Sequence, residues 1–99
     1  MACDNYDYDC TDDCVDAWEL SRLYGCNESP TPLQNFDNVE IGDLLEFNQG
    51  GERIWGEVVE ICRCYVIVVV ISDLVLPHPF SKGDRVLLNI VNIYNWRSQ

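Results

Sequence analysis

The densest hydrophobic pattern in the chain lies between Gly42 and Asn95, and it predicts short β-strands. Apolar and β-branched residues concentrate there, whereas every other segment is too polar or too short to form a core alone. The predicted strands are Leu44–Asn48, Arg53–Cys62, a third that follows a turn at Arg63 and runs to Ser72, Arg85–Asn89, and Ile90–Trp96, which forms a 3₁₀ turn or a fifth strand. Four or five short strands favour a mainly β fold, a small antiparallel barrel, because closure removes exposed strand edges.

Glycine turns separate these strands. The segment Gln49-Gly50-Gly51-Glu52 is typical of a β-hairpin, and Lys82-Gly83-Asp84 parallels Gly42-Asp43 as a second tight turn. Apolar positions in the second strand change parity near Val58–Glu60. A β-bulge there would reconcile the two parities.

The third strand is apolar at both parities from Val66 to Ile71. Such a strand is buried on both faces. One face points into the sheet's own core, and the other requires a cover. That cover is either an N-terminal helix or a second protein chain.

The N-terminal part predicts an acidic arm, one short helix and a linker. Asp12 or Asp13 is a suitable N-cap, and Gly25 is suited to end the helix. Helical spacing places Ala17, Leu20, Leu23 and Tyr24 on one side and allows Glu19 to pair with Arg22. The predicted organisation is an acidic arm at 1–11, a helix at 12–25, a proline-containing linker at 26–38 and the barrel at 39–96.

The net negative charge comes entirely from the first half of the chain. Residues 1–50 contain twelve Asp and Glu against Arg22 alone, whereas residues 51–99 contain five acidic and five basic residues. A surface of this sign repels phosphate, so a nucleic-acid partner is not expected. The acidic half suits a basic protein partner or acts as a solvated tail.

No targeting segment or membrane span is expected. The first seven residues have neither the basic nor the apolar part of a signal peptide. The longest apolar run, Tyr65–Ile71, has seven residues, against the ~20 that a membrane span requires. The expected location is intracellular.

Six cysteines leave several chemistries open. Cys3, Cys10, Cys14 and Cys26 precede the strands, and Cys62 and Cys64 flank a turn within them. The thiols are reduced, or Cys10 or Cys14 forms a disulfide with Cys26, or the first four bind zinc. Zinc is the weaker alternative because the usual ligand spacing occurs only once. A metal- or redox-responsive role of these four thiols is the alternative function.

Catalytic motifs are not found. His78 is the only histidine, and it lies between two prolines with no nucleophile motif beside it. A histidine that shapes the loop is the simpler interpretation. We therefore expect a protein that is not an enzyme and has no cofactor.

Residues 41–96 resemble SH3-like barrels of the Tudor and KOW type, and are similar to uncharacterised small domains of bacteria and large DNA viruses. The features that carry the resemblance are Ile41-Gly42-Asp43, Gly51 to Val59, Asp73-Leu74, Pro77-His78-Pro79-Phe80, Lys82-Gly83-Asp84 and Asn92-Ile93-Tyr94. The resemblance implies an SH3-like barrel with a non-enzymatic adaptor role, and in a viral setting a minor structural or accessory protein of the virion. The apolar third strand and the acidic N-terminus depart from that pattern.

The expected function is a protein-interaction or assembly module that binds a partner or itself. The expected docking residues lie on the third strand, on the proline-bounded loop and on the second strand: Val66, Val68, Val70, Pro77, His78, Phe80 and Trp55. A methyl-lysine cage built by Trp55, Glu57 and Phe80 is a further hypothesis, as in Tudor-like barrels. Core packing explains the same aromatic residues more simply.

Overall fold

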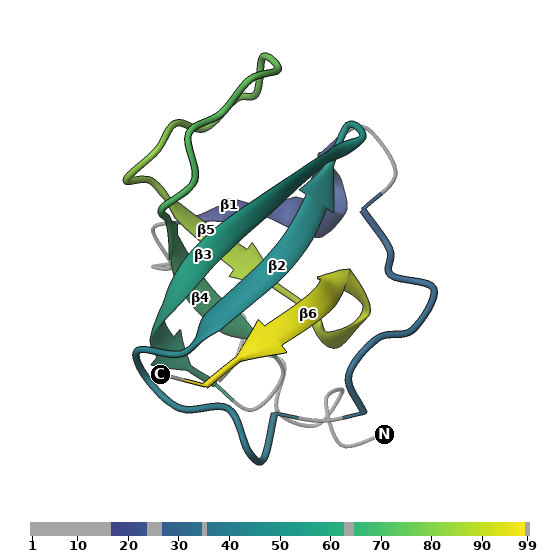
Figure 1. Cartoon of the computed structure of the whole chain (residues 1–99), viewed down its shortest axis with the longest axis vertical. Helices are drawn as coiled ribbons and strands as arrows, with labels where there is room; N and C mark the ends of the chain where they lie inside the picture. The colour runs from purple at the N-terminus through teal and green to yellow at the C-terminus, as the bar shows by residue number, and fades with distance from the viewer. Residues whose placement is uncertain (1–16, 24–26, 35, 63–64, 99) are drawn as a thin grey trace.

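The computed structural model describes residues 17–23, 27–34, 36–62 and 65–98, which form one strongly twisted sheet (Figure 1). The elements in chain order are β1 (Trp18–Glu19), the 3₁₀ helix η1 (Leu20–Arg22), β2 (Leu44–Gln49), β3 (Glu52–Ile61), β4 (Val66–Val70), β5 (Arg85–Leu88), the 3₁₀ helix η2 (Ile90–Asn92) and β6 (Ile93–Arg97). The strand order is β1-β5-β4-β3-β2-β6. The prediction of a mainly β fold is confirmed.

The sheet is open rather than closed into a barrel. Its end strands are β1 and β6, and these two do not pair with each other. The sheet is also mixed, because β1 runs parallel to β5, with Trp18 opposite Val86, whereas the other neighbouring strands are antiparallel. The prediction of a closed, purely antiparallel barrel is therefore wrong. The predicted ending is confirmed in both of its forms, since the 3₁₀ turn η2 leads directly into β6.

The predicted helix at 12–25 is not found over residues 17–23, the part of it that the structure describes. Here the chain forms β1 and η1 instead. Ala17 packs in one apolar cluster and Leu20 in another, so the two residues do not share a helical stripe. The backbone of β1 pairs with β5, and this tertiary pairing overrides the local helical pattern. The predicted pairing of Glu19 with Arg22 is confirmed at 3.1 Å, on the exposed side.

Two tight turns use the same hydrogen bonds. In each turn a glycine has a left-handed backbone, φ +97° at Gly42 and +95° at Gly83. The aspartate that follows, Asp43 or Asp84, accepts a bond through Oδ2 from the backbone amide three residues earlier, at 2.9 and 2.8 Å. The carbonyl of each aspartate accepts a bond from a sheet amide, at 2.8 and 3.0 Å. The predicted parallel between the two turns is confirmed.

The predicted bulge in the second strand is also confirmed. The register of β3 against β4 shifts between Val58 and Glu60. Gly56 lies opposite Val70, and a Cβ atom added to it would lie 2.7 Å from the Cβ of Val68. The absence of a side chain at Gly56 therefore lets β3 and β4 approach closely where the sheet coils.

The core explains the doubly apolar third strand. Val66, Val68 and Val70 are buried in the main core, whereas Ile67 belongs to a second cluster on the opposite face of β4. That second cluster also contains Tyr65 and Leu87, with Ala17 and Cys62 packed against it. Burial of both faces is therefore confirmed only around Ile67, since on its face Val69 is half-buried and Ile71 is 37% exposed; Ala17 contributes to the cover without being helical.

A buried asparagine network fastens the segment before β2 to η2. The Asn92 side chain is fully buried, donates to the carbonyl of Asn27 at 2.9 Å and accepts from the amide of Asn89 at 2.9 Å. Asn27 in turn donates to the carbonyl of Leu20 at 2.8 Å. Sequence reasoning missed this network, because asparagine at a turn usually signals a local bond rather than a tertiary one.

Candidate interaction surfaces

The loop between β4 and β5 projects from one end of the sheet and is tied down at a single carboxylate (Figure 1). Glu52, the first residue of β3, accepts bonds from the backbone amides of Val75 and Leu76 at 2.8 and 2.9 Å. Its Oε1 atom also lies 2.7 Å from Nε2 of His78. One side chain thus fixes three residues of the loop. We call Leu74–Pro79 the apolar loop.

The contacts of Glu52 favour its ionised form. The hydrogen bond with His78 lowers the pKa of Glu52 below its ordinary value of 4.5, and the bonds from Leu76 and Val75 lower it further. The His78 side chain is only 2% exposed and stacks on the Phe80 ring, with centroids 5.2 Å apart. The interpretation of His78 as a residue that shapes its loop agrees with this placement.

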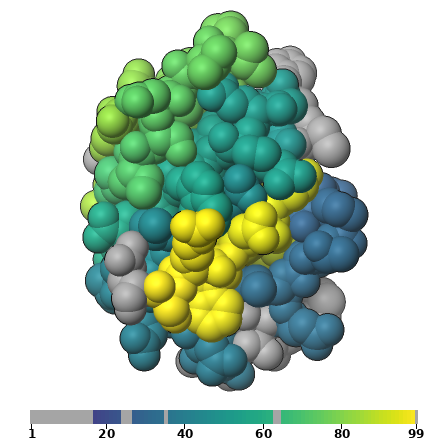
Figure 2. All heavy atoms as spheres, viewed as in Figure 1, coloured from purple at the N-terminus to yellow at the C-terminus, as the bar shows by residue number. Residues whose placement is uncertain are grey.

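The tip of the apolar loop exposes hydrophobic side chains. Val75 is 84% exposed and Leu76 is 43% exposed, and Pro77 beside them is also exposed. In the space-filling view the loop stands out from the body of the molecule at the top (Figure 2). The loop therefore has a backbone that is held by Glu52 and apolar side chains that are exposed to solvent. This arrangement is suited to contact with another molecule.

The structure divides the expected docking residues between core and surface. Val66, Val68, Val70 and Phe80 are each at most 2% exposed and belong to the main core. Their side chains form no surface in this fold, because β3, β5 and the residues around them cover them. Of the remaining three, Pro77 is exposed, the His78 side chain is buried, and Trp55 is half-buried on the opposite face of β3.

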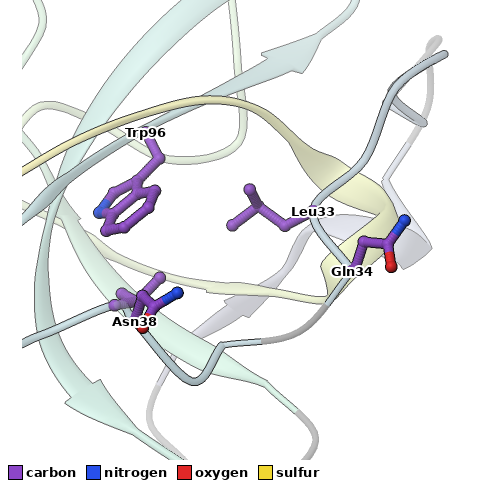
Figure 3. Close-up of a pocket in the computed structure, with 5 residues that line it drawn as sticks. Leu33, Gln34, Asn38 and Trp96 are labelled. Atoms are coloured by element: carbon purple, nitrogen blue, oxygen red, sulfur yellow. The ribbon is translucent and has the colours of Figure 1, made fainter.

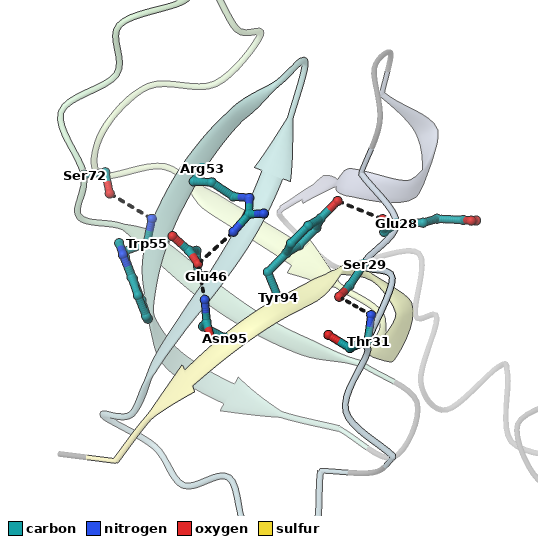
Figure 4. A network of polar contacts seen from close by, with 9 residues as sticks. All are labelled: Glu28, Ser29, Thr31, Glu46, Arg53, Trp55, Ser72, Tyr94 and Asn95. Carbon is teal, nitrogen blue, oxygen red and sulfur yellow. Dashed lines mark hydrogen bonds and ion pairs between the residues drawn. The ribbon is translucent and has the colours of Figure 1, made fainter.

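The face of β3, β2 and β6 that carries Trp55 is polar (Figure 4). Glu46 accepts bonds from Arg53 at 3.3 Å and from Asn95, so one carboxylate joins all three strands. The Arg53 guanidinium lies 4.2 Å from the centroid of the Tyr94 ring. These contacts form a closed network within the chain.

The three residues of the hypothetical methyl-lysine cage do not come together. Phe80 lies in the main core, where its ring is 6.2 Å from that of Phe47, whereas Trp55 faces the polar side of the sheet. The Arg97 guanidinium already lies 5.4 Å from the centroid of the Trp55 ring. The amide of Trp55 donates to the hydroxyl of Ser72 at 2.8 Å, which extends the pairing of β3 beyond the end of β4. The cage is therefore not supported.

A cleft of about 330 Å³ lies beside β6 (Figure 3). Its lining residues come from the segment before β2 and from β6: Leu33, Gln34, Asn38, Val39 and Trp96. Figure 3 shows Leu33 and Trp96 on facing sides of the opening and Asn38 beside it, whereas the side chain of Gln34 points away from it. No signal in the sequence identified this cleft, because its two walls are separated by about sixty residues of chain.

Cys3, Cys10, Cys14 and Cys26 lie outside the described residues, as does Cys64. Cys62 is a half-buried free thiol packed against the second apolar cluster. Within the part of the chain that the structure describes, no three histidine, cysteine or carboxylate side chains gather at a metal-binding distance. The same residues contain no helix with the length and hydrophobicity needed to cross a membrane.

Comparison with protein-family models, curated proteins and solved structures gives no match to this chain. Function is therefore inferred from the surfaces themselves.

Proposed function

We propose that this chain is a non-enzymatic protein-interaction module that docks through the tip of the apolar loop. One observation carries the proposal: Val75 is 84% exposed, although its backbone is held in place. The backbone amides of Val75 and Leu76 both donate hydrogen bonds to Glu52. A loop already fixed in one conformation loses little entropy on binding. Its exposed apolar side chains then gain the burial that the chain's own fold denies them.

Charge supports a basic partner. The chain has a net charge of −11, which steers cationic surfaces toward it and keeps copies of the chain apart. We therefore infer a partner with an apolar pocket surrounded by lysine or arginine. Association should weaken with added salt mainly through a slower on-rate.

We further propose that the module acts as an adaptor, with a minor structural or accessory role in a virion as one setting for it. A metal- or redox-responsive role of Cys3, Cys10, Cys14 and Cys26 stays a prediction, since these four residues lie outside the part of the chain that the structure describes.

Site-specific photocrosslinking tests the proposal. A photoreactive amino acid at position 75 should crosslink to one predominant protein in cells that produce the chain, whereas the same group at exposed position 57 should not. The Val75→Ser/Leu76→Ser double variant should remove the interaction with that protein while leaving the fold intact, because both side chains are exposed.

The opposite results would contradict the proposal. Equal crosslinking from positions 75 and 57 would mean that the loop has no special role. An unchanged affinity of the double variant for the captured protein would mean that docking occurs elsewhere. Sedimentation of the purified chain distinguishes the assembly form of the proposal, since self-association through the loop should be lost in the same variant.

A further inference from the structure

The tip of the apolar loop, residues 75–77, has no free hydrogen-bond donor. The backbone amides of Val75 and Leu76 both donate to Glu52, at 2.8 and 2.9 Å. Pro77 has no amide hydrogen. The side chains of these three residues are hydrocarbon and cannot donate either. A partner that covers the tip therefore finds nothing there that donates a hydrogen bond to it.

The same three residues keep their acceptors. In the part of the chain that the structure describes, no hydrogen bond reaches the carbonyl of Val75, Leu76 or Pro77. All three residues are exposed, and the loop stands out from the body of the molecule (Figure 2). A carbonyl that is buried in an interface without a donor costs free energy. The partner must therefore supply donors to the tip while it covers the apolar side chains.

This one-sided hydrogen-bonding pattern narrows the chemistry of the partner. A strand that pairs with another strand both donates to it and accepts from it. The tip cannot donate in return, because its two amides are bonded to Glu52. Carboxylate groups only accept hydrogen bonds, and the net charge of −11 repels them. The groups that fit are cationic and only donate, which are the side chains of lysine and arginine.

We propose that the partner docks on this tip through an arginine that lies beside an apolar pocket. The inference rests on the proposed function and names the group that reads the tip. A guanidinium has five N–H donors and no acceptor, arranged in a plane, so it can bond to neighbouring carbonyls while its face lies on hydrocarbon. A lysine ammonium is more strongly hydrated and gathers its donors at one point. Arginine therefore matches the tip better than lysine does.

Selection from a peptide library tests the proposal. Random peptides displayed on phage are first depleted of all those that bind the Val75→Ser/Leu76→Ser variant, and are then selected against the full parent chain. The depletion removes peptides that are attracted only by net charge, because the variant and the parent have the same charge. Among the peptides that remain, arginine should be enriched over the unselected library more strongly than lysine, and aspartate and glutamate should be depleted.

Synthetic copies of the selected peptides measure what the arginine contributes. Replacing the enriched arginine by alanine should weaken the affinity for the full chain about tenfold, because a bond between a charged donor and a carbonyl is lost. Replacement by lysine should weaken the affinity less. In NMR of the chain labelled with ¹³C and ¹⁵N, the parent peptide should shift the carbonyl signals of Val75 and Leu76. The carbonyl signal of Glu57, in β3, is the control and should not move.

Several results would overturn the proposal. One is a selection that leaves no loop-dependent peptide, or in which lysine is enriched as strongly as arginine. Another is an unchanged affinity when alanine replaces the arginine, and a further one is carbonyl signals of Val75 and Leu76 that stay in place. Photocrosslinking from position 75 decides the proposed function separately, since it captures any protein that docks at the tip, with or without an arginine.

Discussion

The Nε2 atom of His78 lies 2.7 Å from Oε1 of Glu52, and this contact joins the apolar loop to the start of β3 across 26 positions in the sequence. Both side chains are largely withdrawn from water, 2% exposed for His78 and 12% for Glu52. Glu52 also accepts hydrogen bonds from two backbone amides of the loop, so this one side chain anchors the loop to β3.

Glu52→Gln should loosen the apolar loop without unfolding the sheet. A glutamine retains one acceptor oxygen but loses the second, so at least one of the amides of Val75 and Leu76 loses its partner. A bond to a charged acceptor contributes about 1.5 kcal/mol or more, so exchange of that amide with deuterium should accelerate by roughly tenfold. Hydrogen exchange followed by NMR measures this. Glu57→Gln, an exposed change on the same strand, should leave both amides as they are.

The stability that Glu52 provides should depend on pH in a defined direction. Its folded-state pKa is below 4.5, chiefly through the hydrogen bond with His78. A depressed carboxyl pKa adds stability that is fully present above the unfolded pKa and is lost as pH falls through the folded pKa.

The urea midpoints of the parent chain and of Glu52→Gln should therefore converge as pH falls from about 6 to about 3. All other carboxylates are common to both proteins, so the difference reports on Glu52 together with its contact to His78. A difference between the two midpoints that stays constant over this range would show that ionised Glu52 does not stabilise the fold.

Gly56→Ala should be strongly destabilising. The added methyl group would contact Val68 at its Cβ and at its Cγ2, and Val68 is fully buried in the main core. Overpacking of this kind costs typically 1–3 kcal/mol, measured as a change in the free energy of unfolding by urea. Combining it with Val68→Ala should cost less than the sum of the two single changes, because the second removes the atoms that clash. Additive costs would contradict the close approach of β3 and β4.

Asp43→Ala should cost more stability than Asp84→Ala, although both residues close equivalent turns. Each change removes a bond to a backbone amide. Only Asp43 also accepts a bond from the partly buried indole of Trp96, at 2.9 Å, and a hydrogen bond to a charged acceptor contributes about 1.5–3 kcal/mol. Urea denaturation of the two variants gives the comparison, and the Trp96 indole signal should move in the first variant only. Equal losses in the two variants would mean that the indole bond adds nothing.

Local features followed directly from the chain. The hairpin at Gly50-Gly51, the repeated glycine–aspartate turns and the bulge near Val58 each depend on a few neighbouring residues, and short-range sterics and side-chain parity were enough to predict them. The burial of Ile67 on the second face of β4 followed from the unbroken run of apolar residues, although Val69 on the same face is only half-buried. The charge asymmetry is likewise a property of the sequence alone.

Tertiary structure decided three features: whether the sheet closes, whether residues 17–23 form a helix, and where the candidate sites lie. Residues 17–23 match a helical stripe, yet β1 forms there because the edge of β5 offers backbone partners that no local pattern reveals. From the sequence alone, the apolar valines of β4 and the ring of Phe80 were predicted to be docking residues. In the folded chain they belong to the main core, because other segments cover them. The cleft at Trp96 brings together residues far apart in the chain, and so do the contacts of Glu52 with the apolar loop. Hydrophobic periodicity reports which side chains seek burial, but not which distant segment will cover them.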